Sequence, residues 1–462
     1  MPQKSGKVGD YGSVLLLLTK KSTMLRCFKQ FVNDNRLFDR NHSLLAAVSG
    51  GADSVVMLHL LAQCRLKVAV AHCNFQLRGA DADGDEKFVR QIAAHYKMPF
   101  FSIRFDTQAY AEQHHLSVEM AARELRYNWF AELAAEHHFD RILTAHHLND
   151  NIETLLLNLT RGTGINGLCG IAAINNNIAR PLLFATREQI EEYTQLKNLT
   201  FRTDCTNLTD DYQRNIVRHQ IVPVLKQINP SFEERMSKNF KHIRQAADIY
   251  NWYVDKAKSE VLKTNDNGCM IDTEKLINQP FAEAILFESI KSYGFNSTQV
   301  EAILKNIGQK SGCTFDSGSH KLLVDRSQII VKSAEQTEFE PIVINSPHNI
   351  DSIGLKMNVV SFDGFVLDKR PNVACLDLDK LQFPLIIRRW RHGDFFYPLG
   401  MTKTQKLSDF LINNKVNVFD KERVMVLTSN ERIVWVIGHR PDNRFKISND
   451  TQHVLVIESP NR

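Results

Sequence analysis

The sequence predicts an α/β protein in which a Rossmann-like parallel-sheet domain is followed by a helical middle domain and a small α+β C-terminal domain. Three observations predict this fold class. From Leu44 onward, short apolar strands alternate with amphipathic helical stretches, which is typical of a parallel sheet covered by helices. Large apolar residues recur at helical spacing beyond Pro230, and β-rich runs follow Leu385.

The first domain is predicted from four strand candidates separated by helical stretches, at residues 44–49, 67–73, 100–105 and 141–146. Ligands of such folds bind at the carboxyl ends of the strands. We therefore expect the chemistry just after Val48, Ala71 and Ala145. The expected boundaries are an uncertain N-terminal extension at 1–23, a catalytic domain at 24–230, a mainly helical domain at 231–332, a strand-bearing connector at 333–384 and a C-terminal domain at 385–462.

Composition places the chain among ordinary globular proteins. With 462 residues it is too long for a single hydrophobic core. It is 43% apolar and 24% charged, and no apolar run approaches a membrane span, so we expect a cytoplasmic protein with no membrane contact. None of the eight cysteines stands in a CxxC arrangement, which argues against a zinc ribbon or a clustered iron–sulfur site. The net charge of +5 is only weak evidence for a nucleic-acid partner.

A glycine-containing turn follows the first predicted strand and precedes a helix that begins near Ser54. Its residues spell S-G-G-A-D-S and are Ser49, Gly50, Gly51, Ala52, Asp53 and Ser54. Two glycines let backbone N–H groups and a helix N-terminus approach pyrophosphate oxygens, and Asp53 could then hold Mg²⁺. The Gly-Lys-Ser/Thr ending of a Walker A loop is absent. A purely structural Gly-Gly turn is the alternative, and we favour the phosphate-binding interpretation.

A second polar cluster follows the fourth predicted strand. His146 and His147 end that strand, Asn149 is a candidate helix cap, and Asp150 and Glu153 share one face of the next helix. Two carboxylates there could hold Mg²⁺ or a substrate ammonium. The alternative is that acidic residues simply favour the helix N-terminus.

The helix predicted at residues 117–134 carries two further candidates. Arg123 and Arg126 share one face, and taken alone they could be ordinary solvated charges. The opposite, buried side is predicted to contain Val118, Ala121, Leu125, Trp129 and Leu133.

Basic residues that could contact RNA lie in two parts of the chain. The first set, Arg161, Arg214 and Arg218, surrounds a glycine-dense loop and the end of the first domain. The second set, Arg388, Arg389, Arg391 and Lys406, flanks an aromatic run near the C-terminus. Cations beside aromatic rings suit phosphates and stacked bases. A strand with an exposed basic face is the structural alternative.

Several of these strings resemble known family motifs. The S-G-G-x-D-S turn resembles the PP-loop of the N-type ATP pyrophosphatases, which adenylate a substrate. The strings A-R-E-L-R-Y, H-H-x-N-D-x-x-E-T and R-P-L-L, with R-R-x-x-x-G-D near the C-terminus, resemble motifs of the tRNA(Ile)-lysidine synthetase family. The chain departs from that pattern at Asn149, where the family has Asp, and at Phe75, Gln76 and Gln405.

The resemblance implies an ATP- and Mg²⁺-dependent ligase that adenylates the wobble cytidine of tRNA(Ile) with a CAU anticodon and then accepts free L-lysine. It implies ATP binding by residues 49–54, metal binding by Asp53 and Asp150, and RNA contacts by the two basic sets. The implied catalytic residues are Asp53, Arg123, Arg126, His146, Asp150 and Glu153.

Three rival interpretations and the oligomeric state remain open at this point. A tRNA thiolase of the same ATPase superfamily would need paired cysteines, and an amide-forming ligase would need an ammonia source. An RNA-binding module with an inactive loop is the non-enzymatic alternative, against which the intact Gly50, Gly51 and Asp53 argue. The sequence does not decide between a monomer and a homodimer.

Overall fold

The computed structural model describes residues 11–77, 79–202, 212–265, 268–309, 312–334, 339–347 and 355–460, with side chains from Thr23 onward except that of Tyr212. The chain forms two compact units, residues 1–250 and 251–462. No helix among the described residues is long and apolar enough to cross a membrane. The first helix, α1 (Tyr11–Asp34), begins upstream of Met24.

The first unit is built on a six-stranded sheet with the order β3-β2-β1-β4-β6-β5. Strands β1 to β4 and β6 pair in parallel, and only β5 is antiparallel to its neighbour. The four predicted strands are all present, with ends shifted by up to three residues. The elements up to β4 are β1 (Ser43–Ala47), α2 (Ala52–Gln63), β2 (Lys67–Asn74), α3 (Ala80–His95), β3 (Phe100–Arg104), α4 (Thr107–His114), α5 (Val118–Glu136) and β4 (Arg141–Leu143).

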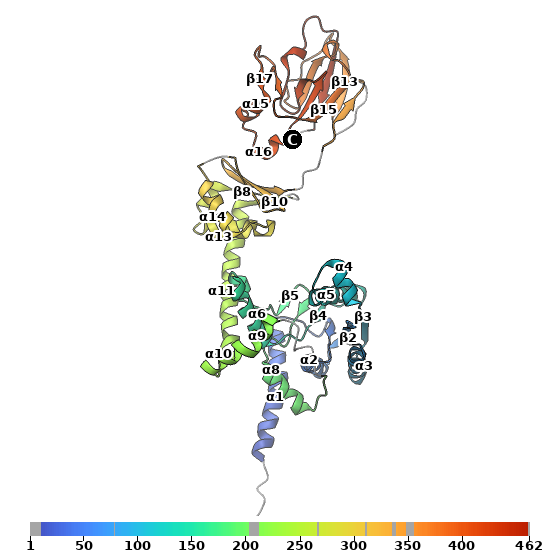
Figure 1. Ribbon diagram of the computed structural model, residues 1–462, viewed down its shortest axis with the longest axis vertical. Helices are drawn as coiled ribbons and strands as arrows, with labels where there is room; N and C mark the ends of the chain where they lie inside the picture. Colours follow the sequence, from blue (N-terminus) through green and yellow to red (C-terminus); the bar gives the residue numbers. More distant parts are fainter. Residues whose placement is uncertain are drawn as a thin grey trace, which may run out of the picture. The chain divides into compact units, whose positions relative to one another are not determined.

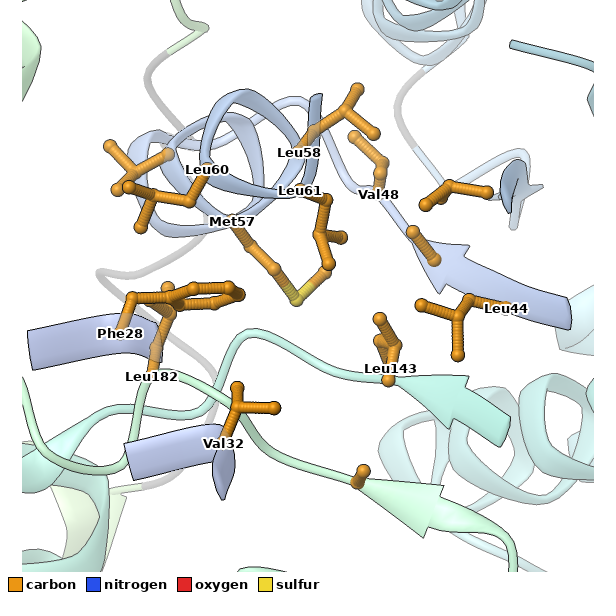
Figure 2. Packing of buried hydrophobic residues seen from close by; sticks show 14 of the residues in the cluster. Phe28, Val32, Leu44, Val48, Met57, Leu58, Leu60, Leu61, Leu143 and Leu182 are labelled. Atoms are coloured by element: carbon orange, nitrogen blue, oxygen red, sulfur yellow. The ribbon is translucent and has the colours of Figure 1, made fainter. Parts of the chain in front are cut away.

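Helices lie against the sheet (Figure 1), and hydrophobic side chains cover both of its faces. Successive strand residues point to opposite faces, so Leu44 packs with α1 and α2 while Leu45 packs with α5. Figure 2 shows Phe28 of α1 and Met57 of α2 meeting above Leu143 of the sheet. On the other face Trp129 contributes to the core. The carboxyl ends of the central strands are thereby held at one edge.

The remainder of the first unit lies after β4. It comprises α6 (Leu148–Arg161), α7 (Ile165–Leu168), β5 (Ile174–Asn175), β6 (Ile178–Ala179), α8 (Arg187–Lys197), α9 (Tyr212–Ile216), the π-helix η2 (Val217–Ile221), α10 (Val222–Ile228) and the start of α11 (Phe232–Val261). Leu148 and Ile152 of α6 share a core with Val217 and Phe240. This core attaches α9, η2 and α11 to the helix that follows β4.

The second unit begins with helices, as expected for the middle domain, and with a sheet that the sequence prediction did not include. Its strands form an antiparallel sheet in the order β7-β8-β11-β10-β9, drawn in yellow with α13 and α14 in Figure 1. The elements are β7 (Leu262–Asn265), β8 (Gly268–Asp272), α12 (Thr273–Ile277), α13 (Ala282–Ile290), α14 (Ser297–Asn306), β9 (Cys313–Asp316), β10 (His320–Asp325) and β11 (Gln328–Ser333). The strands alternate buried and exposed residues only briefly, which hides them in the sequence.

The C-terminal part contains two more sheets, β12-β15-β18-β19-β20 and β13-β21-β14, and a β16-β17 pair. Its elements are β12 (Ile342–Ile344), β13 (Lys356–Ser361), β14 (Val373–Asp377), β15 (Leu385–Arg389), β16 (Phe395–Phe396), β17 (Gln405–Lys406), α15 (Leu407–Asn413), α16 (Val418–Lys421), β18 (Met425–Ser429), β19 (Arg432–Val436), β20 (Arg440–Pro441) and β21 (His453–Glu458). Strands β12 to β14, which lie in the expected connector, thus pair with C-terminal strands around the buried Trp435.

Candidate active site

The turn between β1 and α2 has the geometry expected of a phosphate-binding loop. Gly50 has a φ of +100°, a conformation that side chains other than glycine rarely adopt. The Ser54 hydroxyl accepts the Gly50 N–H at 3.1 Å and donates to the Gly51 carbonyl at 2.9 Å. Gly51 caps α2, whose first N–H groups have no carbonyl partner within the helix. The loop therefore presents the positive end of a helix at the carboxyl edge of the sheet.

Asp53 and Asp150 both lie near one nitrogen of the buried His147 imidazole. His147 Nε2 is 3.9 Å from Asp53 Oδ2 and 3.6 Å from Asp150 Oδ2. Burial raises the pKa of Asp53, and the nearby negative charge of Asp150 raises it further against the opposing effect of His147. Two hard carboxylates that repel each other fit a Mg²⁺ ion, which commonly takes one or two carboxylates and completes its shell with substrate phosphates and water. His147 was not among the predicted site residues.

The start of α6 holds Asp150 ionised. Although burial opposes it, His147, His146 and the His147 N–H, which donates to Asp150 Oδ2 at 2.9 Å, lower the pKa of Asp150. Burial lowers the pKa of His146 to about 4, so its ring is neutral near pH 7. The structure corrects the expected cap, because His147 rather than Asn149 precedes the first helical residue.

Glu153 is buried and paired with two arginines from the segment after α8. Arg214 Nε donates to Glu153 Oε2 at 2.7 Å, and Arg218 Nε donates to Oε1 at 2.7 Å. Both guanidinium groups also lie 3.7 Å from Asp150. The π-helix η2 begins at Val217, between the two arginines. Glu153, Arg214 and Arg218 thus form one charged cluster that joins α6 to α9 and η2.

A cavity of about 630 Å³ opens beside this cluster and the phosphate loop. Its lining includes Ser49 and Gly51 of the loop, Arg123 and Arg126 of α5, and His146. Arg214 also lines it, whereas Asp53, Asp150 and Glu153 do not. The sequence-predicted loop, arginine pair and histidine therefore converge on one hollow, with the charged cluster behind it.

Side chains of α5 and of the segment after β2 line the cavity. The Arg126 guanidinium lies 5.1 Å from the centre of the Phe75 ring, which stacks on Phe105 at 5.7 Å. Arg123 lies 5.1 Å from the ring of Tyr127. Val118 lines the cavity and is 41% exposed, which corrects its expected position in the core. Its helix begins there, and the surrounding elements do not cover the first turn.

The unusual Asn149 makes contacts that suit an amide. Its Nδ2 donates to Glu233 Oε1 at 2.7 Å, and its Oδ1 accepts the Arg187 N–H at 2.9 Å. An aspartate at this position would place a second carboxylate against Glu233, a repulsive arrangement. The side chain therefore links α6 to α8 and α11.

The basic residues predicted to contact tRNA have different surroundings. Arg161 is exposed and donates to Gln213. In the C-terminal part, both terminal nitrogens of Arg388 donate to Asp394 at 2.8 Å, so this side chain stabilises the turn after β15. Arg389 is half-buried, and Arg391 and Lys406 are exposed. The two exposed side chains are the ones free to approach a polyanion in solution.

Comparisons with known proteins agree with this geometry. Family models match as a PP-loop domain over residues 20–225, a TilS substrate binding domain over 264–334 and a TilS substrate C-terminal domain over 385–458. The tRNA(Ile)-lysidine synthases of Parabacteroides distasonis and Bacteroides thetaiotaomicron are each 38% identical to the chain. These matches cover 94% and 93% of this chain and 99% and 98% of the relatives.

A third relative extends the similarity. The tRNA(Ile)-lysidine synthase of Porphyromonas gingivalis is 35% identical over 92% of this chain and 96% of its own length. The similarity therefore runs through the catalytic unit, the middle domain and the C-terminal domain alike. The chain belongs to the tRNA(Ile)-lysidine synthase family, whose members are ligases that form a carbon–nitrogen bond.

Proposed function

We propose that this chain joins free L-lysine to C2 of the wobble cytidine of tRNA(Ile) with a CAU anticodon. In this scheme ATP adenylates the cytidine O2 with release of pyrophosphate, and the lysine ε-amine then displaces AMP to form lysidine. Family membership and the PP-loop domain support an ATP-using tRNA ligase. The observation that carries the proposal is the cavity, because it brings the phosphate loop, two arginines and a neutral histidine around one space.

The loop and the arginines account for the first half-reaction. The N-terminus of α2 and the Gly51 N–H would hold the pyrophosphate that leaves, since Gly51 caps α2 and lines the cavity. Arg123 and Arg126 would neutralise charge that develops on the α-phosphate. Magnesium held by Asp53 and Asp150 would supply further neutralisation of the phosphates.

The second half-reaction requires a neutral lysine amine, because an ammonium has no lone pair to attack with. His146 lines the cavity and is neutral near pH 7, so it can accept a hydrogen bond from the amine and orient it beside the activated carbon. A pKa of about 4 makes it a weak base.

We further propose that RNA contacts are made by the exposed basic residues. Arg391 and Lys406 flank the exposed Phe395, so cations and a stacking surface occur together. Arg161 would contribute in the first unit. Arg388 would act indirectly, by holding the turn through Asp394. A cytoplasmic location follows from a tRNA substrate and belongs to the same proposal.

The test is to incubate the protein with Mg²⁺-ATP, labelled lysine and unmodified tRNA(Ile), and then to analyse the digested nucleosides. Label is expected in the anticodon nucleoside. Asp53→Ala is expected to abolish incorporation while leaving retention of tRNA on a filter largely intact, because Asp53 is not one of the residues proposed to contact tRNA. Glu188→Ala, at an exposed carboxylate in the first turn of α8, is the matched control.

Two results would contradict the proposal. If Asp53→Ala incorporates lysine as well as the parent does, Asp53 is not a required ligand of Mg²⁺. Pyrophosphate release that occurs equally without tRNA, and no label in RNA, would favour an ATP-dependent ligase acting on another substrate.

A further inference from the structure

The phosphate loop is held by Arg202, a residue that the sequence did not single out and that lines the same cavity. The backbone N–H of Arg202 donates to the carbonyl oxygen of Gly50 at 3.0 Å. Arg202 follows α8 and is remote in sequence from the loop. With the Ser54 hydroxyl on the Gly50 N–H, both polar groups of Gly50 are engaged by protein.

Fixing the Gly50 carbonyl also fixes the direction of the next N–H group. In a planar trans peptide the C=O of one residue and the N–H of the next point in opposite directions. Because the Gly50 carbonyl points to Arg202, the Gly51 N–H points the other way, where its weak contact is Ser49 Oγ at 3.4 Å. Ser49 and Gly51 both line the cavity. Rotation of this peptide would turn that donor away, and two adjacent glycines oppose such rotation little.

The Arg202 side chain is itself clamped to α3. Its Nε donates to Asp85 Oδ1, and its Nη2 lies 3.9 Å from Asp81. Gly84 lies beneath the guanidinium, since a Cβ there would stand 3.2 Å from Nη2. Asp85 is buried. The side chain thus anchors the backbone that in turn holds Gly50.

We propose that Arg202 is a positioning residue for nucleotide binding, which keeps the Gly50–Gly51 peptide oriented so that the Gly51 N–H faces the phosphates. Asp85 is the anchor that makes this possible. The inference rests on the use of ATP in the proposed function and adds a determinant of that site. It predicts that loss of Arg202 lowers the affinity for ligands that carry the β- and γ-phosphates, because the loop would contact those phosphates.

The test measures binding alone, by calorimetric titration with a non-hydrolysable ATP analogue and Mg²⁺, without tRNA or lysine. Arg202→Ala and Asp85→Asn are each expected to weaken binding roughly tenfold, and the double variant should bind no more weakly than Arg202→Ala. The affinity of both variants for inorganic pyrophosphate should fall by a similar factor. Arg202→Lys should recover part of the affinity that Arg202→Ala loses. Arg90→Ala is the control: it removes an exposed arginine of α3 itself, which pairs with Glu86 at 3.1 Å. The affinity of this variant for the analogue should stay within about twofold of the parent.

The outcomes separate this inference from its alternatives. The inference would be overturned if Arg202→Ala and Asp85→Asn both bind the ATP analogue as tightly as Arg90→Ala does. It would also be overturned by an equal loss of affinity for adenosine, which carries no phosphate, because that result indicates general damage to the site. If Arg202→Ala does not fold, Asp85→Asn gives the answer alone. These titrations measure nucleotide binding alone, so a failure to form lysidine would contradict the proposed function without deciding the role of Arg202.

Discussion

Two strand-to-helix turns meet at the same edge of the sheet and are built in different ways. The β1–α2 turn uses backbone groups, with a left-handed Gly50 and a serine that folds back onto the loop. The β4–α6 turn uses side chains, with Asp150 and Glu153 held by histidines and by arginines of α9 and η2. The first turn depends on six consecutive residues and one outside hydrogen bond. The second depends on partners more than sixty positions away.

The difference predicts how each turn responds to mutation. A backbone site is sensitive to the conformational preference of a single residue and tolerant elsewhere. A side-chain site contains buried charges, and removal of one partner leaves the others uncompensated. Substitutions in the two turns therefore test whether this division is correct.

The largest effect on stability is expected from Glu153→Ala. The substitution leaves Arg214 and Arg218 without their buried carboxylate, which is 2% exposed, and breaking such a cluster costs about 3 kcal/mol of unfolding free energy. Glu191→Ala, which removes an exposed partner of Arg187, should cost about 0.5 kcal/mol or less. Urea unfolding of both variants measures the contrast. Equal midpoints would show that the charged cluster is not a structural link.

A smaller loss is expected from Gly50→Ala in the backbone turn. Alanine disfavours a φ of +100°, and its Cβ would stand 3.4 Å from Val89 Cγ2, so we expect a cost of about 2 kcal/mol. Gly51→Ala is the matched control, because Gly51 has a φ of −70° and the nearest atom to its Cβ would be 3.6 Å away. Its unfolding midpoint should lie close to that of the parent. A Gly51→Ala variant as unstable as Gly50→Ala would contradict the proposed geometry.

The same division explains what the sequence could predict. The parallel strands and the glycine turn after β1 depend on local patterns, so the sequence predicted their places in the fold; phosphate binding by the turn stays a prediction. The contacts of His147 with Asp53 and of Arg202 with Gly50 join segments far apart in the chain. His147 was placed in the second polar cluster from its position at the strand end, but its contact with Asp53 was not predicted.

Domain content followed a similar rule. The long α11 was predicted because its apolar residues recur regularly from Phe232 onward. The middle sheet, whose strands span four to six residues, was not predicted. Arg388 was predicted as an RNA contact because composition shows a cationic cluster, whereas its pairing with Asp394 is visible only in the fold. Assignments of individual roles within a charged cluster therefore require coordinates.

The smallest effect at neutral pH is expected for His146→Asn, whose signature is a change in pH dependence. The folded imidazole has a pKa of about 4 against 6.5 for its ordinary value. Between these values the unfolded chain binds the extra proton, so stability rises with pH by up to about 1.4 kcal/mol per unit and levels off above 6.5. The asparagine variant should lose this slope, yet differ from the parent by about 1 kcal/mol or less at pH 7.5. Unfolding midpoints measured from pH 4 to 7.5 give both curves. Parallel curves of stability against pH for the parent and the variant would mean that His146 protonates as readily in the folded protein as in the unfolded chain, which would contradict this prediction.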